Sequence, residues 1–262
     1  MPNRPIKLTP FHRMAQRLNA QFAQYNGWKV PEVYTSPEAE IDAARNSVVL
    51  ADETPNGKFI IEGNQAEDAL NAVFNQLPTL AINAGTIIGS NRVYRLRGDR
   101  FFISTPPEEA AAMEGKLSAA AKNSAQLLTV TDVTHGRAEI RVIGPNSQNL
   151  LSKLCGLDFQ AATFPGSGIR GPGSGVEAFV FAGPRTPDPE SRGFPDGTAK
   201  ESSLAKTTQL IIRRDIGELP AFSIIGARSM GVYLWETIME AGHEWGLVPM
   251  GCAALNLLEK SR

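Results

Sequence analysis

The apolar residues follow two periodicities, one typical of strands and one typical of helices, and the order of these two is repeated along the chain. Alternating apolar and polar residues run from Lys58 to Gly63, and a stretch with helical periodicity follows over 65–74. The same order returns with an alternating stretch over 137–144 and helical periodicity over 147–154. Each alternating stretch follows a turn and ends at a glycine. The pattern therefore predicts strand, turn and helix twice.

The remainder of each half also matches. Residues 92–96 and 101–104 predict a hairpin that turns at 97–99, before a helix over 107–121. Later, residues 209–213 and 221–225 predict a hairpin that turns near Gly217, before a helix over 229–241. Strand, helix, hairpin and helix is the order of the ferredoxin-like split βαβ motif.

These patterns predict the fold class. We expect an α+β protein in which two ferredoxin-like halves, about 1–125 and 126–262, form a single domain over 1–262. A ligand site is expected where the two sheets meet.

Residues 164–205 interrupt this pattern. They are rich in Gly, Pro, Ser and Asp, and only 176–181 reads as a short strand. We expect an irregular insertion over about 164–205. It is either a surface insertion or a lid or subunit contact, since loops of this length in compact domains are often functional.

Composition narrows the function classes. The 26 Lys and Arg residues nearly balance the 27 Asp and Glu residues, so no overall field favours nucleic acid or an anionic membrane. No apolar run is long enough to span a bilayer, and the N-terminus lacks an apolar signal core. The three His residues share no metal-ligand spacing. We predict a soluble cytoplasmic protein with a small-molecule substrate and without a metal, a nucleic-acid partner or a membrane partner.

Both ends of the chain carry family motifs. The stretch 231–255 is an amphipathic helix up to Gly242, then G-L-V-P-M-G and a second helix. Near the N-terminus stand T-P at 9–10, G-W-K-V-P at 27–31 and A-R-N-S at 44–47. These motifs resemble the folate-binding domain of the glycine-cleavage T-protein (aminomethyltransferase) family. The resemblance implies the folate-binding fold, one-carbon chemistry and tetrahydrofolate as cofactor. Full-length family members continue into a C-terminal barrel, which we expect this chain to lack.

The family's three polar anchors are replaced. The carboxylate pair of its hairpin falls on Gly89 and Ser90, the pteridine-binding Glu falls on Ser223, and the supporting Arg falls on Leu255. A serine hydroxyl cannot accept two parallel N–H bonds from a pterin edge as a carboxylate can. The resemblance thus implies that the usual aminomethyl transfer is lost, unless Asp99 or Asp215 takes the reaction centre.

The middle of the chain resembles a second family. The segments D-V-T-H-G-R at 132–137 and L-C-G-L-D-F at 154–159 resemble the gamma subunit of heterotetrameric sarcosine oxidases. That resemblance implies flavoprotein oxidase partner subunits. The Gly-rich stretch 165–175 contains prolines and has no strand-to-helix setting, so we expect no flavin bound by this chain alone.

Eight residues are candidates for the site. His135, Asp215 and Glu218 are the catalytic candidates, because imidazole and carboxyl groups can exchange protons near neutral pH. The candidates for binding substrate or cofactor are Arg213 for a carboxylate, the rings of Tyr94, Trp28 and Tyr25 for a planar ligand, and Ser223 at the pteridine position. The structural alternatives are a turn histidine, a solvated strand end and core aromatic residues.

Two functions remain open on this evidence. The first is a diverged one-carbon enzyme that demethylates, or releases formaldehyde from, a small substrate with or without tetrahydrofolate. The alternative is a non-catalytic subunit of a flavin oxidase complex, in a hetero- or homo-oligomer.

Overall fold

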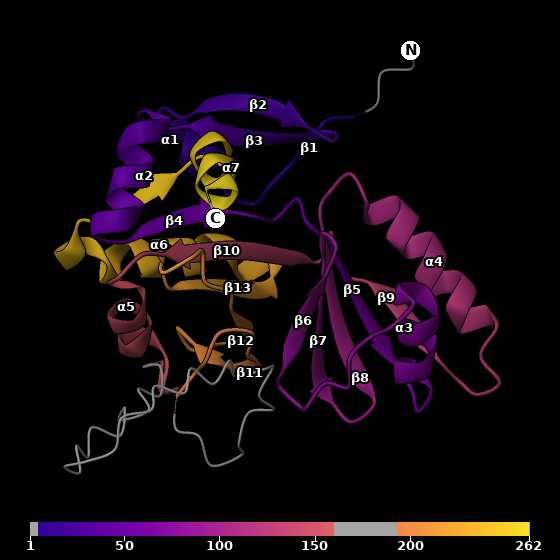
Figure 1. The fold of residues 1–262 in the computed structure, drawn as a ribbon. Coiled ribbons are helices and arrows are strands. Elements are labelled where there is room, and N and C mark those ends of the chain that lie inside the picture. Colours follow the sequence, from indigo (N-terminus) through magenta and orange to yellow (C-terminus); the bar gives the residue numbers. More distant parts are fainter. Residues whose placement is uncertain (1–4, 160–192, 262) are drawn as a thin grey trace, which may run out of the picture.

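The computed structural model describes residues 5–159 and 193–261. Their strands form sheets of three, six and five strands, with helices packed on the outside (Figure 1). The six- and five-stranded sheets each belong to one of two repeated units, and the three-stranded sheet belongs to an N-terminal layer.

The first unit contains the five-stranded sheet, in the order β6-β7-β8-β5-β9. Its elements are β5 (Gly57–Glu62), α3 (Ala66–Phe74), β6 (Gly85–Ile88), β7 (Asn91–Arg97), β8 (Arg100–Thr105), α4 (Ala110–Lys122) and β9 (Thr129–Asp132). All neighbouring strands are antiparallel. Without the edge strand β6, the order β7-β8-β5-β9 is that of a ferredoxin-like unit. Apolar residues of α3 and α4 pack on one face of this sheet and form its core.

The second unit contains the six-stranded sheet, in the order β11-β12-β13-β10-β4-β14. Its elements are β4 (Val49–Asp52), β10 (Arg137–Ile143), α5 (Ser147–Leu154), β11 (Ala199–Leu204), β12 (Thr207–Arg213), β13 (Ala221–Ala227), α6 (Gly231–Ala241) and β14 (Val248–Met250). The order β12-β13-β10-β4 is again ferredoxin-like. Apolar residues of α5 and α6 pack in its core.

Each unit contains one strand from outside its own continuous stretch of sequence. The fourth strand of the second unit is β4, which precedes the whole first unit, whereas β9 lies beyond residue 125 and completes the first unit. The α+β fold and its duplicated order are therefore confirmed. The division at about residue 125 stays a prediction, and strands on both sides of it are shared between the sheets.

The N-terminal layer covers the second unit next to β4 (Figure 1). It consists of β1 (Lys7–Leu8), α1 (His12–Arg17), β2 (Gln21–Tyr25), β3 (Trp28–Val33) and α2 (Pro37–Asn46), together with the C-terminal helix α7 (Cys252–Lys260). Short 3-10 turns at Arg228–Met230 and His243–Trp245 flank α6. Helix α2 starts at Ser36, whose hydroxyl accepts a hydrogen bond from the N–H of Ala39.

The start of α7 is fixed against this layer. A Cβ at Gly251 would lie 2.1 Å from the carbonyl oxygen of Glu32, so only glycine permits this approach. The N–H of Gly251 donates to the buried carboxylate of Glu40, which also accepts from the N–H groups of Tyr34 and Thr35. These contacts hold the side chains of α7 over the edge of the interface between the units.

The end of the expected insertion is regular, which corrects one prediction. Residues 199–204 form β11, which pairs with β12 along its length. Ala199 and Leu204 are fully buried, so the segment has a core face despite its many polar residues. The strand expected over 176–181 lies outside the described residues.

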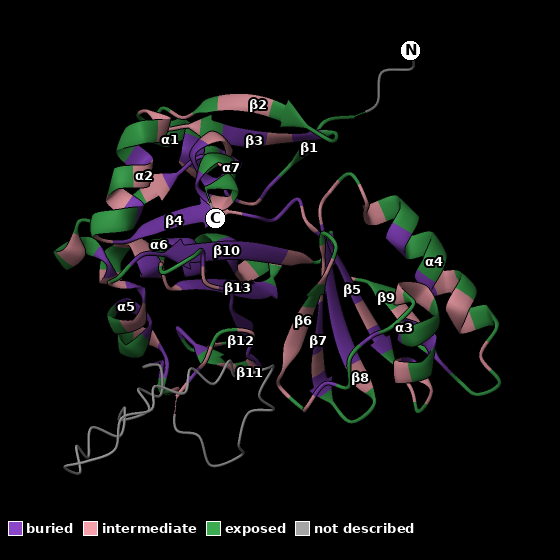
Figure 2. Cartoon of the chain, in the orientation of Figure 1, coloured by how far each residue is buried: buried purple, intermediate pink, exposed green. Residues whose placement is uncertain are grey.

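The two large sheets face each other through an apolar contact. Tyr94, Leu96 and Phe102 of the first unit meet residues of β11, β12 and β13, and all are buried. Strands β10 and β13 beside this contact are buried along most of their length (Figure 2). Two cavities open along the margins of this contact, one near the start of β7 and the other near its end.

Candidate functional site

The first cavity lies between the N-terminal layer, α7 and the first unit, and its volume is about 430 Å³. Strands β2 and β3, the end of β4, the start of β7, the turn before α4 and helix α7 all contribute to its wall. Five acidic residues line it: Glu32, Asp52, Glu53, Glu108 and Glu259. Arg92 is the cationic residue among the lining residues.

A network of buried ion pairs forms the inner wall. Both carboxylate oxygens of Glu53 accept hydrogen bonds from Nη2 of Arg214, at 3.0 and 2.9 Å. Glu259 accepts from Nη1 of Arg214 at 3.0 Å and also from Nη1 of Arg141. Nη2 of Arg141 donates to the carbonyl oxygen of Arg214 at 3.0 Å. The network thus joins β4, β10, β12 and α7.

Burial sets the electrostatics of this network. Burial raises the pKa of Glu53, but the guanidinium groups of Arg214 and Arg141 outweigh it, so the pKa lies well below its usual value. Burial and the neighbouring Arg214 lower the pKa of Arg141 to about 10. Arg141 is fully buried, and such groups are tolerated only when paired. The network therefore stays charged at neutral pH.

Arg92 stands apart from these pairs. Burial, and then repulsion from Arg214, lower the pKa of its guanidinium. Its side chain makes no hydrogen bond or ion pair with any described residue. Arg141 and Arg214 pair with Glu53 and Glu259, whereas Arg92 is left without such a pair. An anionic group of a ligand could pair with the guanidinium of Arg92.

Asp52 supplies an acid group to the same wall. Its Oδ1 accepts a hydrogen bond from the N–H of Thr54 at 3.0 Å. Its Oδ2 is buried, and the hydroxyls of Thr9 and Thr54 interact with the carboxyl and partly counter the effect of burial on its pKa. Burial raises the pKa of Asp52 above its usual value. A carboxyl group with a raised pKa can exchange a proton with a bound ligand.

Tyr25 and Glu108 lie together at the mouth of the cavity. The hydroxyl of Tyr25 donates to Glu108 at 2.7 Å, and burial together with this carboxylate raises the pKa of Tyr25 to about 12. The adjacent Glu109 accepts a hydrogen bond from the hydroxyl of Ser90 at 2.6 Å. Ser90 holds one of the two positions at which the family motif has carboxylates. Carboxylates therefore reach this hairpin from the start of α4.

The structure brings some predicted residues to the cavity. Tyr25 lines it, and Tyr94 is buried beside Arg214 and Arg92 at the contact between the sheets. Ser223 is buried in β13, directly opposite Arg141 in the strand pairing. Leu255, at the family's Arg position, also lines the cavity. A buried Arg141–Glu259 ion pair thus lies one strand over from Ser223 and one helical turn beyond Leu255.

Arg213 and Asp215 lie together, but outside this cavity. Arg213 makes a bidentate contact with Asp215, donates to the carbonyl oxygen of Phe194 at 2.8 Å and lies over the ring of Phe222. Neighbouring residues of a strand point to opposite faces, so Arg213 faces the core while Arg214 faces the cavity. Glu218 is exposed in the turn between β12 and β13.

His135 and Trp28 form a separate contact. Their rings stack with centroids 5.4 Å apart, and Trp28 is buried while Lys7 lies against its ring. Burial, and then the charge of Lys7, lower the pKa of His135. Neither residue lines the cavity. The catalytic roles of His135, Asp215 and Glu218 stay predictions.

Sequence reasoning did not select the residues that dominate the cavity. Asp52, Arg92 and Glu259 line it, and Arg141 and Arg214 pair with its lining glutamates. The sequence offered one signal for them, the alternation of side chains along each strand. This alternation decides which of two adjacent residues faces the contact between the sheets and which faces the opposite side. Cys252, which also lines the cavity, has a pKa raised to about 11 by burial, so its thiol stays protonated at neutral pH.

Within 5–159 and 193–261, no group of three His, Cys, Asp or Glu side chains is placed to hold a metal ion. No helix in the same ranges is long and apolar enough to cross a membrane.

Comparison with known proteins identifies the family. The model of the GCVT N-terminal domain matches residues 11–182. The aminomethyltransferase of Halothermothrix orenii is 24% identical over 97% of this chain and 64% of its own length. The sarcosine oxidase subunit alpha of Corynebacterium sp. strain P-1 is 25% identical over 98% of this chain and 26% of its own length. The chain thus spans less than two thirds of these relatives.

Solved structures agree on the fold. The glycine cleavage system aminomethyltransferase T of Bartonella henselae superimposes with a TM-score of 0.71, at 18% identity, over 97% of this chain and 62% of that chain. A chain of the heterotetrameric sarcosine oxidase of Corynebacterium sp. U-96 gives 0.60, at 16% identity, over 90% and 95%. The molecule is therefore an α+β protein of the T-protein fold. It belongs to the GCVT N-terminal domain family.

Proposed function

We propose that the protein is a diverged one-carbon enzyme that acts on a small anionic amine in the cavity at Arg92. The observation that carries this proposal is that two groups line the same cavity: the guanidinium of Arg92, which makes no ion pair with a described residue, and the carboxyl of Asp52, whose pKa burial raises. Perturbed titratable groups that converge on a cavity are typical of functional sites.

Arg92 would anchor the substrate. Its planar guanidinium can accept a carboxylate in bidentate geometry, and the partly buried setting strengthens that contact. The Glu53–Arg214 and Glu259–Arg141 pairs hold the wall behind it in a fixed arrangement. Because both glutamates are engaged by arginines, Arg92 remains available to the ligand.

Asp52 would move the proton. For a substrate with an N-hydroxymethyl group, the C–N bond breaks, the hydroxyl proton leaves, and formaldehyde is released while the nitrogen gains a proton. Asp52 can supply the proton to nitrogen and recover one from the hydroxyl, and no oxidant is needed. Burial raises the pKa of Asp52, which favours the protonated form that can give a proton to the nitrogen.

Tetrahydrofolate is the cofactor class that the family suggests, and the cavity residues fit it in part. In place of the small substrate, tetrahydrofolate could use the same two anchors: Asp52 can pair with a pterin edge, the ring of Tyr25 lies at the mouth, and Arg92 can hold a carboxylate of the glutamyl tail. When bound, the cofactor would supply nitrogen atoms that accept the one-carbon group. The protein's own residues would orient the ligand and exchange its proton.

The test combines binding and turnover. Purified protein is incubated with N-hydroxymethyl derivatives of glycine and sarcosine, and formaldehyde release above the uncatalysed rate is measured. We expect Asp52→Asn to lower the rate about 100-fold, while Asp42→Asn, an exposed aspartate on α2, leaves it unchanged. Equal rates for wild type and Asp52→Asn would reject the proposal.

A second candidate is a subunit of a flavoprotein oxidase complex. It is supported by the extent of the structural likeness, which spans 95% of the matched sarcosine oxidase chain. Under this alternative the protein would co-purify from its natural host with a flavin-containing chain. The mass of the isolated protein, measured by light scattering, would increase when that chain is added. A homo-oligomer would instead show a multiple of 28.3 kDa without any flavin absorbance.

A further inference from the structure

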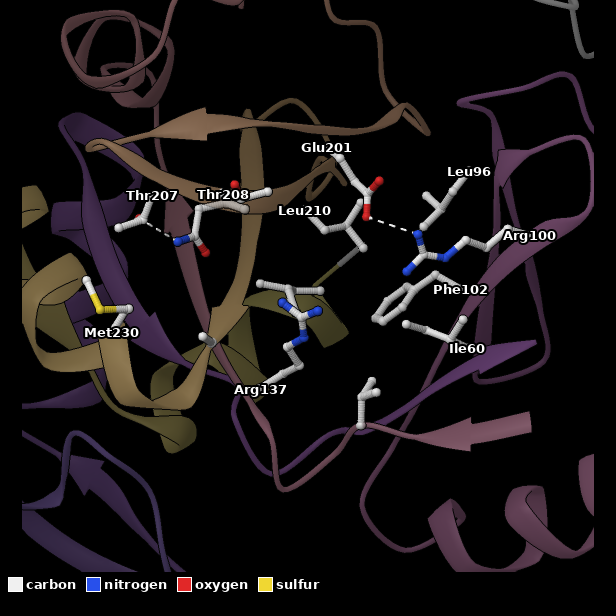
Figure 3. Close-up of a pocket in the computed structure, with 14 residues that line it drawn as sticks. Ile60, Leu96, Arg100, Phe102, Arg137, Glu201, Thr207, Thr208, Leu210 and Met230 are labelled. Atoms are coloured by element: carbon white, nitrogen blue, oxygen red, sulfur yellow. Dashed lines mark hydrogen bonds and ion pairs between the residues drawn. The ribbon is translucent and has the colours of Figure 1, made fainter. Parts of the chain in front are cut away.

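A second cavity lies at the other margin of the contact between the two sheets. Its volume is about 340 Å³, and it is enclosed by β8, β10, β12 and β13 (Figure 3). Leu96, near the end of β7, lines it, whereas Arg92 at the start of that strand lines the first cavity. The two cavities share no lining residue.

The wall of this second cavity is largely hydrocarbon. Eight of the lining residues are apolar, against six that are polar or charged: Ile60, Leu96, Phe102, Val133, Leu210, Ile225, Ala227 and Met230. Leu96, Phe102, Leu210 and Ile225 also belong to the buried contact between the sheets, so the apolar floor is set by the fold. A ligand that fills this space must present an apolar body.

One cation projects into this apolar space. Arg137, the first residue of β10, shares a strand face with Glu139 and Arg141, because side chains alternate along the strand. Figure 3 shows its guanidinium in the middle of the cavity, below Leu210 and beside Phe102 and Ile60. The side chain makes no hydrogen bond or ion pair with any residue in the part of the chain that the structure describes.

The other charges at this site are already balanced. Arg100 lies 3.7 Å from Glu201 and 3.8 Å from Glu62. Arg97 also lies 3.6 Å from Glu201, so Arg97 and Arg100 together offset these two carboxylates and Arg137 is left as the uncompensated charge. A ligand with one negative charge would neutralise Arg137, whereas a dianion such as a phosphate ester would meet repulsion from Glu201.

From these observations we propose that the second cavity binds a small monocarboxylate with an aryl or branched aliphatic body. The carboxylate pairs with Arg137 in the bidentate geometry that guanidinium favours, and the body packs against Phe102, Leu210 and Ile225. The site is independent of the one proposed for one-carbon chemistry. Each can fail without the other.

The probes are phenylacetate and its neutral counterpart phenylacetamide, titrated into the full chain and followed by calorimetry and by NMR of the Ile and Met methyl groups. We expect phenylacetate to bind at least about tenfold more tightly than phenylacetamide, because only phenylacetate carries a negative charge that can pair with Arg137. The methyl signals of Ile60, Ile225 and Met230 should shift. No binding of phenylacetate by folded protein at 5 mM, on the order of weak-ligand affinities, would overturn the proposal.

Matched variants locate the binding. Arg137→Gln should weaken phenylacetate binding about tenfold and abolish the preference over phenylacetamide. Arg97→Gln is the control, because Arg97 is a largely exposed arginine that contacts Glu201 but does not line the cavity. Thr208→Trp, an exposed position on the cavity face of β12, should block entry without disturbing the core. Unchanged binding in both Arg137→Gln and Thr208→Trp would refute the site.

Discussion

Arg92 and Arg137 both direct a guanidinium without an ion-pair partner among the described residues toward a cavity, but their surroundings differ. Arg92 is placed beside a network of buried charges, so its cavity is polar and offers a proton-exchanging carboxyl. Arg137 is placed among apolar side chains, and its cavity offers one charge and a hydrocarbon wall. One duplicated scaffold thus provides two recognition chemistries, set by which residues flank a similar cation.

The largest expected effect comes from the network behind Arg92. Replacing Glu53 by Gln leaves Arg141 and Arg214 buried with Glu259 alone, so we expect a loss of about 3–5 kcal/mol in the free energy of unfolding. Urea denaturation measures it. The control Glu244→Gln removes a surface ion pair with Lys153 and should cost about 0–1 kcal/mol. A loss for Glu53→Gln no larger than for Glu244→Gln would show that the network does not organise the wall.

Lowering the pH should reduce the free energy of unfolding by less than the Glu53→Gln substitution does, because the carboxylates of the network protonate only in part over the accessible pH range. The pKa of Glu53 is lowered in the folded state, so its stabilisation is complete above the usual value of 4.5 and is lost as pH falls below it. Urea midpoints measured from pH 7 to pH 3 should therefore decline below about 4.5. The decline should be shallower in Glu53→Gln. An identical pH dependence in both proteins would contradict the assigned pKa shift.

Removing an arginine that has no ion-pair partner should increase the stability of the fold. Arg92→Met and Arg137→Met each delete a partly buried charge and keep the length of the side chain, so we expect each to gain about 1 kcal/mol in stability. By contrast, Arg214→Met breaks buried pairs and should destabilise strongly. Thermal unfolding of the three variants measures the difference. A destabilised Arg92→Met would mean that Arg92 supports the fold and is not reserved for a ligand.

The fold could be largely predicted because its periodic patterns are local. Helix α5 begins and ends at the residues where helical periodicity does, and both hairpins stand where turn residues separate alternating strands. The exchange of β4 and β9 between units could not be predicted, since both are four-residue strands whose partners lie far away in the sequence. The edge strand β11 was hidden by its polar composition.

The site was harder to predict because it depends on strand phase and distant pairing. Arg213 was chosen although its neighbour Arg214 faces the cavity, and a shift of one residue reverses the face. Glu259 lies one turn beyond the family's Arg position, so motif alignment at Leu255 passed over it. The pKa of Asp52 is raised by burial in the folded protein, which local sequence does not show.

The most direct test of the central claim is calorimetric titration of wild type and Arg92→Gln with tetrahydrofolate and 5-formyltetrahydrofolate. If the cavity holds the ligand through Arg92, wild type should bind at one site per chain with a dissociation constant in the micromolar range, and Arg92→Gln should bind about tenfold or more weakly while remaining folded. Equal binding by both proteins, or no binding by wild type, would contradict the assignment of this cavity to folate-linked one-carbon chemistry.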